Sequence, residues 1–274
     1  MSVIDFSIII PFYNKEATIE LALKSLLDQQ YPKEKYEIIC VDNNSVDNSR
    51  LIISRYPSIK LIQEKTQGAY IARNTGILAS SGTFLVFSDA DVVTPENWLA
   101  NIHFALSKEN FDILIGWYRP VGSSKLLQIH SLIVCERIKI ALNKKQVSMI
   151  TASACNLIIK KSVFEKEGLF VNVPRSEDKH FVLRCFEKGY KVGFDDKIAV
   201  VRNDINSLWV ALLKNFTYGY SNALYINRKF SPLKGIMWEF LFKWFPAGLG
   251  LLLFSLSYYA GYCLGWLKRI SSVS

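Results

Sequence analysis

Apolar runs of strand length alternate with helix-like segments through the first half of this chain. Within the helix-like segments the hydrophobic residues recur every three to four positions, which is the spacing of an amphipathic helix. Strands that are apolar on both faces and are separated by helices form parallel sheets that are covered on both sides. The pattern predicts strands at Phe6–Ile10, Tyr36–Val41, Ile59–Ile62 and Phe84–Phe87, and helices at Glu16–Gln29, Val46–Arg55 and Gly68–Leu78.

The second half of the sequence is less regular. Its patterns predict strands at Phe111–Ile115, Asn156–Ile159 and Ala199–Val201, and helices at Leu126–Leu142, Ser162–Lys166, Glu177–Lys188 and Ser207–Tyr225. A chain of 274 residues fits one large domain, or one domain with an appended segment. We therefore expect an α/β domain over residues 1–228, followed by a segment of different character over residues 229–274.

The net charge of the chain is +9, and it is unevenly distributed. From Arg202 onward, eight basic residues stand against two acidic ones, so this part alone carries +6. Basic residues interleaved with Trp, Phe and Leu favour binding to an anionic membrane surface. The sequence contains no zinc-finger spacing and no RNA-binding signature, so we expect no nucleic acid partner.

The cysteines and the start of the chain bear on the compartment. The five cysteines are scattered and include no C-x-x-C pair, which is typical of reduced residues in a cytoplasmic protein. No signal-peptide pattern precedes the strand predicted at Phe6–Ile10. We therefore expect the chain on the cytoplasmic side of a membrane.

The segment Trp244–Leu267 is a run of 24 residues without a charge. As a helix it would be roughly 36 Å long, enough to cross a hydrocarbon core of about 30 Å. Trp238, Trp244 and Trp266 lie near its ends, as interfacial anchors do, whereas tyrosines near its middle and basic residues on both flanks argue against a simple span. One spanning helix, two interfacial helices, a re-entrant hairpin and a buried core helix stay open as its geometry.

Two carboxylates, Asp89 and Asp91, directly follow the strand predicted at Phe84–Phe87. Ligands of open α/β sheets bind beyond the carboxyl ends of the strands. Paired carboxylates at that edge suit a hard divalent cation, which completes its coordination shell with phosphate oxygens. The alternative is an Asx-turn that caps a helix starting near Thr94-Pro95-Glu96.

Six segments together resemble the family 2 glycosyltransferases, which are inverting, nucleotide-sugar-dependent enzymes with the GT-A fold. The resemblance covers about residues 6–225 and rests on the order and spacing of Ile8–Glu16, Ile39–Ser49, Gly68–Gly76, Asp89–Asp91, Cys155–Ile159 and Ser176–Asp178. It implies a Rossmann-like, mostly parallel sheet with helices on both faces. It also implies a nucleotide-sugar site that includes Pro11, Tyr13, Glu16, Asp42, Arg73, Asn74, Asp89 and Ala90.

The resemblance also assigns the metal and the base. Asp91 would be the direct ligand of a divalent cation, Mg2+ or Mn2+, and Asp89 would bind ribose or a metal-bound water. The cation would neutralise the charge that develops on the departing diphosphate. Asp178 would be the general base that takes the proton of the acceptor hydroxyl. A single base opposite the leaving group implies inversion at the anomeric carbon.

Several of these roles have structural alternatives. Asp42 would bind the base or ribose, or cap the following helix. Arg73 suits a phosphate, or an ion pair with Asp89 or Asp42. Tyr13 would stack on the base, or pack in its turn. The pair Glu177-Asp178 would also stabilise a helix N-terminus.

The sequence departs from the family pattern at two places. Many relatives carry a second Asp where Asn43 stands. Relatives often place a metal-binding His after the last strand, where this chain has Arg202-Asn203-Asp204. Asn203, Asp204 or water would replace that ligand, or Arg202 would take over part of the phosphate neutralisation.

The function we expect is transfer of a sugar from a UDP-linked donor to a hydroxyl of a saccharide or lipid-linked saccharide at a membrane. A polyprenyl-phosphate glycosyltransferase is the first alternative, and it would need cations such as Arg175, Lys179 or Arg202 near the acceptor. A catalytically silent scaffold is the second. Pro11-Phe12-Tyr13-Asn14 is not the glycine- and arginine-rich phosphate loop of a nucleotidyltransferase. The sequence leaves open the donor sugar, the acceptor and whether the chain forms an oligomer.

Overall fold

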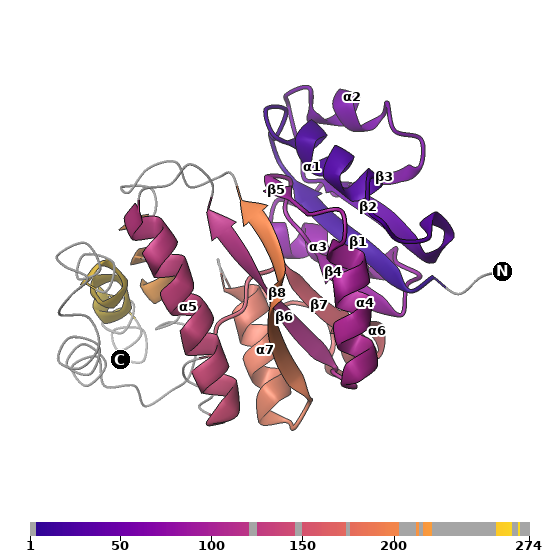
Figure 1. Ribbon diagram of the computed structural model, residues 1–274. Helices are drawn as coiled ribbons and strands as arrows, with labels where there is room; N and C mark the ends of the chain where they lie inside the picture. Colours follow the sequence, from indigo (N-terminus) through magenta and orange to yellow (C-terminus); the bar gives the residue numbers. More distant parts are fainter. Residues whose placement is uncertain are drawn as a thin grey trace.

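The computed structural model describes residues 4–120, 125–145, 150–173, 176–202, 212–213, 216–220, 256–264 and 268. These residues form one eight-stranded sheet with helices on both of its faces (Figure 1). The strands are β1 (Phe6–Phe12), β2 (Tyr36–Asp42), β3 (Ile59–Gln63), β4 (Phe84–Phe87), β5 (Val92–Val93), β6 (Ile113–Pro120), β7 (Leu157–Lys160) and β8 (Val192–Arg202). The helices are α1 (Ile19–Leu27), α2 (Ser49–Ile53), α3 (Ala69–Leu78), α4 (Trp98–Lys108), α5 (Lys125–Asn143), α6 (Lys161–Glu167) and α7 (Glu177–Glu187), with a 3-10 turn at Lys33–Lys35.

The sheet has the strand order β3-β2-β1-β4-β7-β6-β8-β5. The four strands of the N-terminal part, β1 to β4, are parallel to one another, as the alternating pattern predicts. Strand β7 is antiparallel to both β4 and β6, and β5 is antiparallel to β8 at the edge. Strands β6 and β8 pair in parallel. The sheet therefore contains both parallel and antiparallel pairs and is mixed.

The two faces of the sheet bury separate apolar clusters, because successive residues of a strand point to opposite sides. Ile8 and Ile10 of β1 pack with α1 and α4, where Trp98 is completely buried. Ile9 packs on the other face, in the cluster that includes Ile77 of α3 and Phe181 of α7. The continuous apolar run of β1 is explained by this double coverage.

The predicted elements that fall on described residues agree with the structure in type and differ mainly at their ends, whereas helix α4 was not among the predicted elements. Helix α2 begins only at Ser49, because the preceding turn is held by side chain to backbone hydrogen bonds such as that from Ser45 N–H to Asp42. Strand β8 starts at Val192, well before the predicted Ala199–Val201, since it pairs along β6 on both sides of a bulge at Gly116/Trp117. The two-residue strand β5 has no sequence pattern of its own.

Asn156 fixes the bulge between β6 and β8. Its buried side-chain amide donates to the carbonyl oxygens of Trp117 (2.8 Å) and Ile198 (2.9 Å) and accepts from the indole N–H of Trp98 (3.2 Å). A Cβ at Gly116 would lie 2.4 Å from Asn156 Nδ2, so only glycine allows this approach. The amide thereby holds β8 against β6 on the C-terminal side of the bulge.

The C-terminal region is described only in part. Residues 216–220 and 256–264 are helical and pack on each other. Most of the predicted membrane-associating segment 229–274, of Trp244–Leu267 and of the helix predicted at Ser207–Tyr225 lies outside the described residues. In the part of the chain that is described, no helix has both the length and the apolarity to cross a membrane.

Candidate functional site

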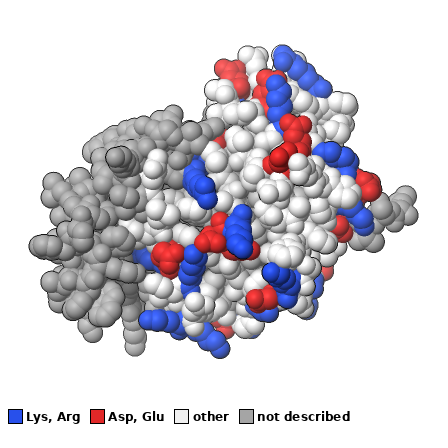
Figure 2. Space-filling view, in the orientation of Figure 1, with Lys and Arg blue, Asp and Glu red and all other residues white. Residues whose placement is uncertain are grey.

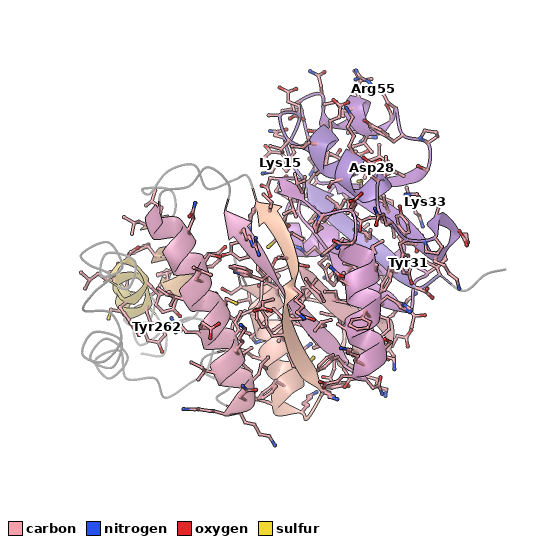
Figure 3. The ribbon with its side chains drawn as sticks, viewed as in Figure 1. Lys15, Asp28, Tyr31, Lys33, Arg55 and Tyr262 are labelled. Atoms are coloured by element: carbon pink, nitrogen blue, oxygen red, sulfur yellow. The ribbon has the colours of Figure 1, made fainter. Side chains whose placement is uncertain are left out.

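Charged side chains from distant parts of the sequence meet beyond the carboxyl ends of β1, β4 and β8. Lys15 follows β1, Asp89 and Asp91 follow β4, and Arg202 ends β8. All of them reach the same edge because their strands point in the same direction. Figure 3 labels Lys15 just above the tip of the strand that Figure 1 labels β8. This edge is the candidate site.

Asp89 lies between two arginines. Its Oδ1 accepts from Arg73 Nη2 at 3.0 Å, and its Oδ2 lies 3.4 Å from Arg202 Nη2. The guanidinium of Arg73 also pairs with Glu177 Oε1 at 2.5 Å and thereby links α3 to α7. Burial by itself would raise the pKa of Asp89, but the charges of Arg202 and Arg73 outweigh it and lower the pKa. Asp89 is therefore a carboxylate, and the ion-pair alternative for Arg73 is what the structure contains.

Asp91 is 3% exposed and pairs with Lys15, whose Nζ lies 2.6 Å from Oδ2. The second oxygen, Oδ1, lies 3.8 Å from Arg202 Nε and has no hydrogen-bond partner within the described residues. A buried carboxylate oxygen without a hydrogen bond is a suitable ligand for a cation. Both aspartates thus face cationic side chains at the strand ends, and helix α4 begins only at Trp98. Because Asn97 is the N-cap residue of α4, neither aspartate caps this helix, and the ligand-binding role of Asp89 and Asp91 stays a prediction.

The protein supplies few ligands at this position. Over the described residues, no cluster of three or more His, Cys, Asp and Glu side chains could hold a metal ion. The predicted substitutes Asn203 and Asp204 lie outside those residues. Asp89 and Asp91 fit a divalent cation whose remaining ligands are substrate phosphates and water, as is common for Mg2+.

Asp178 lies in the first turn of α7 and is partly buried. Its Oδ2 accepts from Ala154 N–H and its Oδ1 from Lys179 N–H, both at 2.7 Å. Burial raises the pKa of Asp178, and the Arg73 charge and the two N–H donors only partly oppose this. Burial, together with the neighbouring Asp178, likewise raises the pKa of Glu177. A carboxylate with a raised pKa is a better proton acceptor near neutral pH.

At the end of β2, Asp42 is completely buried. Its Oδ1 accepts from Ser45 N–H at 2.9 Å, and Arg50 Nη1 lies 3.2 Å from its Oδ2. The carboxylate therefore holds the turn after β2 but does not cap α2, which begins at Ser49. A role in base recognition stays a prediction.

The remaining predicted donor-site residues differ in how accessible their side chains are to a ligand. Tyr13 is 49% exposed, so its ring can meet a ligand. Glu16 accepts two hydrogen bonds from Asn48 and ties the loops after β1 and β2 together. The amide of Asn74 is bonded to the backbone of Phe170 through both of its polar atoms. Pro11 lies within β1, and Ala90 is buried between the two aspartates of the site.

Tyr218 connects the C-terminal region to the site. Burial raises the pKa of Tyr218 to about 12 although the residue is 37% exposed; the charge of Arg202 opposes this shift, and the charges of Asp178 and Asp89 add to it. Its helix, residues 216–220, is the one that packs on residues 256–264. The environment of the carboxylates therefore includes this helix.

Sequence reasoning gave no role to Lys15 and did not predict the link from Arg73 to Glu177. Lys15 stands inside the quoted segment Ile8–Glu16, but nothing local indicates that its side chain reaches Asp91, 76 positions away. For Arg202 the sequence suggested two roles, partial phosphate neutralisation in place of a missing ligand and a cation near a phosphate acceptor, but no contact with Asp89. Its place at the end of a strand was the one signal available.

The charge pattern of the surface gives no further indication. On the face shown in Figure 2, basic and acidic side chains of the described residues are interspersed. The basic excess lies mostly in the C-terminal region, as the sequence shows.

Comparison with known proteins points in the same direction as the geometry. The family model described as "Glycosyl transferase family 2" matches residues 7–168. Glycosyltransferase AglE of Haloferax volcanii is 32% identical over 197 residues, which are 69% of this chain and 63% of AglE. The chain spans about half to two thirds of the length of the first curated relatives that it matches.

Two solved structures show the same fold. Mannosyltransferase PcManGT from Pyrobaculum calidifontis, in complex with GDP-Man and Mn2+, has a TM-score of 0.67 and 17% identity over 98% of this chain and 73% of its own. TarS 1-349 of S. aureus, in complex with UDP-GlcNAc, has a TM-score of 0.62 and 18% identity over 98% of this chain and 92% of its own. The mixed α/β, Rossmann-like GT-A fold is thus confirmed.

Proposed function

Because this chain belongs to glycosyl transferase family 2, we propose that it transfers a sugar from a nucleoside diphosphate donor, UDP-linked, to a hydroxyl of a saccharide or lipid-linked saccharide. The observation that carries the proposal is the meeting of Asp89 and Asp91 with Arg73 and Arg202 at one edge of the sheet, with Asp178 next in sequence to Glu177, the second partner of Arg73. The choice of donor is supported by the UDP-GlcNAc in a TarS structure, while the GDP-Man in PcManGT marks the competing donor class.

On the donor side, the cations of the chain would neutralise the diphosphate. Arg202 and Lys15 contact the carboxylates at the strand ends, so both lie within reach of a phosphate bound there. A divalent cation, Mg2+ or Mn2+, bound at Asp91 and Asp89 would supply further charge neutralisation for the leaving group. Arg73 would keep Asp89 ionised and oriented through its paired contacts.

On the acceptor side, Asp178 would act as the general base. Its carboxylate takes the proton of the acceptor hydroxyl while that oxygen attacks the anomeric carbon. The bond from the anomeric carbon to the β-phosphate oxygen breaks, and the nucleoside diphosphate leaves with the electron pair. Attack opposite the leaving group inverts the anomeric configuration. The raised pKa of Asp178 suits proton transfer near neutral pH.

The alternative functions have less support. A phosphate acceptor would need cations near the nucleophile, whereas Arg202 pairs with Asp89 and lies beside Asp91. Arg175 lies outside the described residues, and Lys179, whose backbone N–H donates to Asp178, is the described cation of this set that is adjacent to the proposed base. A silent scaffold would have no use for a partly buried Asp178 with a raised pKa beside the paired carboxylates.

The test is a donor screen that measures the nucleoside diphosphate released in the presence of a divalent cation and simple alkyl glycosides. We expect a UDP-sugar to be consumed, and Asp178→Asn to lower kcat at least about 100-fold with donor affinity nearly unchanged. The rate of the wild type should fall as the pH drops through the raised pKa of Asp178, which lies above the usual value of about 3.9. Asp28→Asn, an exposed carboxylate at the end of α1 (Figure 3), is the matched control.

One result would refute the proposal as a whole, and another would refute only the role of Asp178. One is a chain that consumes no UDP-, GDP- or TDP-sugar under these conditions. The other is Asp178→Asn with wild-type kcat, which would remove the base but leave the donor assignment standing.

A further inference from the structure

Lys15 is anchored by its backbone and reaches across the site with its side chain. Its carbonyl oxygen accepts from Thr18 N–H (3.0 Å) and Ile19 N–H (2.9 Å), and its N–H donates to Ser49 Oγ (2.8 Å). The four-carbon side chain then spans to Asp91, and the side chain of Lys15 is 36% exposed. The ammonium can therefore move away from Asp91 while the Cα of Lys15 stays fixed.

The ammonium of Lys15 lies where a cation would bind. It is 2.6 Å from Oδ2 of Asp91, a residue with 3% exposure. The other oxygen, Oδ1, is buried and lacks a hydrogen bond among the described residues. The neighbouring Asp89 is already paired with Arg73 and Arg202. A divalent ion entering this site meets three positive side chains around two carboxylates.

These charges make binding of the divalent cation depend on binding of the donor. An ion with only two carboxylate ligands needs further oxygen donors, and the cationic side chains oppose it until negative charge is added. A donor diphosphate supplies both the oxygen atoms and the negative charge. It also offers Lys15 a new partner, so that no charge is left unpaired when Lys15 leaves Asp91.

We propose that Lys15 is a displaceable counterion of Asp91: it keeps the site closed to divalent cations in the free chain, and it transfers to the donor diphosphate when cation and donor bind together. The inference rests on the proposed function, because it takes the donor to be a nucleoside diphosphate. Lys15 is in this sense a positioning residue, and its action is visible in binding without turnover.

The test is a titration of the full chain with Mn2+ alone, followed by electron paramagnetic resonance of free Mn2+, and repeated with saturating UDP. We expect Lys15→Gln to bind Mn2+ at least about tenfold more tightly than the wild type in the absence of UDP, since removing one positive charge a few ångströms away removes strong repulsion. We also expect UDP to increase the Mn2+ affinity of the wild type more than that of Lys15→Gln, because only in the wild type does the diphosphate draw away a side chain that competes with the cation for Asp91.

Lys24→Gln is the matched control. Lys24 also forms an ion pair, with Glu20 on the surface of α1, and its removal should leave Mn2+ binding unchanged. Asp91→Asn should abolish Mn2+ binding both in the otherwise wild-type chain and in Lys15→Gln. Lys15→Gln with equal or weaker Mn2+ affinity than the wild type would overturn the inference, and so would a wild type whose Mn2+ affinity is independent of UDP. Failure of the proposed function would appear separately, as the absence of donor consumption in the screen.

Discussion

Asn43 stands where the family resemblance implies a second aspartate, and its side chain holds a loop. Its Nδ2 donates to the carbonyl oxygens of Thr66 (2.7 Å) and Glu64 (3.2 Å), and its Oδ1 accepts from Gly68 N–H (2.8 Å). The side chain is 3% exposed. An aspartate at this position could accept from Gly68 but could not donate to the two carbonyl groups. The amide therefore holds the loop before α3, the helix that carries Arg73.

We expect Asn43→Asp to lower the free energy of unfolding by about 2 kcal/mol, because two carbonyl oxygens would lose their donor and face a buried charge. Urea denaturation followed by circular dichroism measures the change. Asn110→Asp, in an exposed turn after α4, is the control and should change stability by less than about 0.5 kcal/mol. If both variants are equally stable, the amide does not hold the loop.

The helix of residues 216–220 and the helix of residues 256–264 pack closely against each other at two glycines. A Cβ at Gly219 would lie 1.9 Å from the carbonyl oxygen of Tyr258, and a Cβ at Gly261 would lie 1.9 Å from that of Phe216. Both values are far below any real contact, so the backbones touch at both points. Ser257 Oγ adds a hydrogen bond to the carbonyl oxygen of Leu212 at 2.5 Å. The C-terminal residues are thus part of the packing behind Tyr218.

Gly219→Ala should loosen this pair of helices by about 1–3 kcal/mol, the usual effect of overpacking. In an isolated helix the same change would be stabilising by about 1 kcal/mol, so the sign of the effect separates the two cases. Hydrogen exchange of peptides that cover residues 216–220 and 256–264 should become faster in this variant.

Ala260→Gly is the control for helix propensity, because Ala260 is exposed on the same helix as Gly261. It should speed exchange only within residues 256–264 and leave residues 216–220 as they are. Unchanged or slower exchange in Gly219→Ala would show that the glycines do not determine the contact.

Most of the net positive charge of the chain lies in its C-terminal part. The described surface carries interspersed charges on the face of Figure 2, whereas the sequence from Arg202 onward carries +6 and includes the uncharged run Trp244–Leu267. Such a combination favours an anionic membrane surface through both charge and apolar insertion. Membrane attachment and the division into residues 1–228 and 229–274 stay predictions.

Vesicle flotation of the full chain tests the attachment. We expect it to float with anionic vesicles and only weakly with neutral ones, and high salt should release it only in part, since salt screens charge but not apolar insertion. Replacement of Lys234, Lys243 and Lys268 by Glu should lower the partition coefficient of the chain onto anionic vesicles at least about tenfold.

The control carries the same change of charge elsewhere, at the exposed residues Lys65, Lys108 and Lys197. This triple Glu variant should float like the wild type. A full chain that stays in the bottom fraction with anionic vesicles would refute the attachment, and equal loss in both variants would refute the role of the tail.

Local patterns in the sequence determined the elements of this protein and part of its site. The apolar runs predicted β1, β2 and β4 because these strands are covered on both faces, whereas the edge strand β3 is only partly buried. The pair Asp89 and Asp91 was visible because both residues directly follow a strand. These features depend on neighbouring residues and on the periodicity of side chains. The resemblance to a family added the roles, and the fold that it implied is confirmed.

The tertiary structure alone decided which charges meet. The antiparallel β7 separates β4 from β6, and the bulge held by Asn156 carries β8 to the edge where Arg202 meets Asp89. Lys15 and Asp91 are 76 positions apart, and Arg73 and Glu177 are 104 apart. No local pattern reports such pairs, because a charged side chain at a strand end is equally compatible with solvent. Only the order and direction of the strands bring these side chains within contact distance.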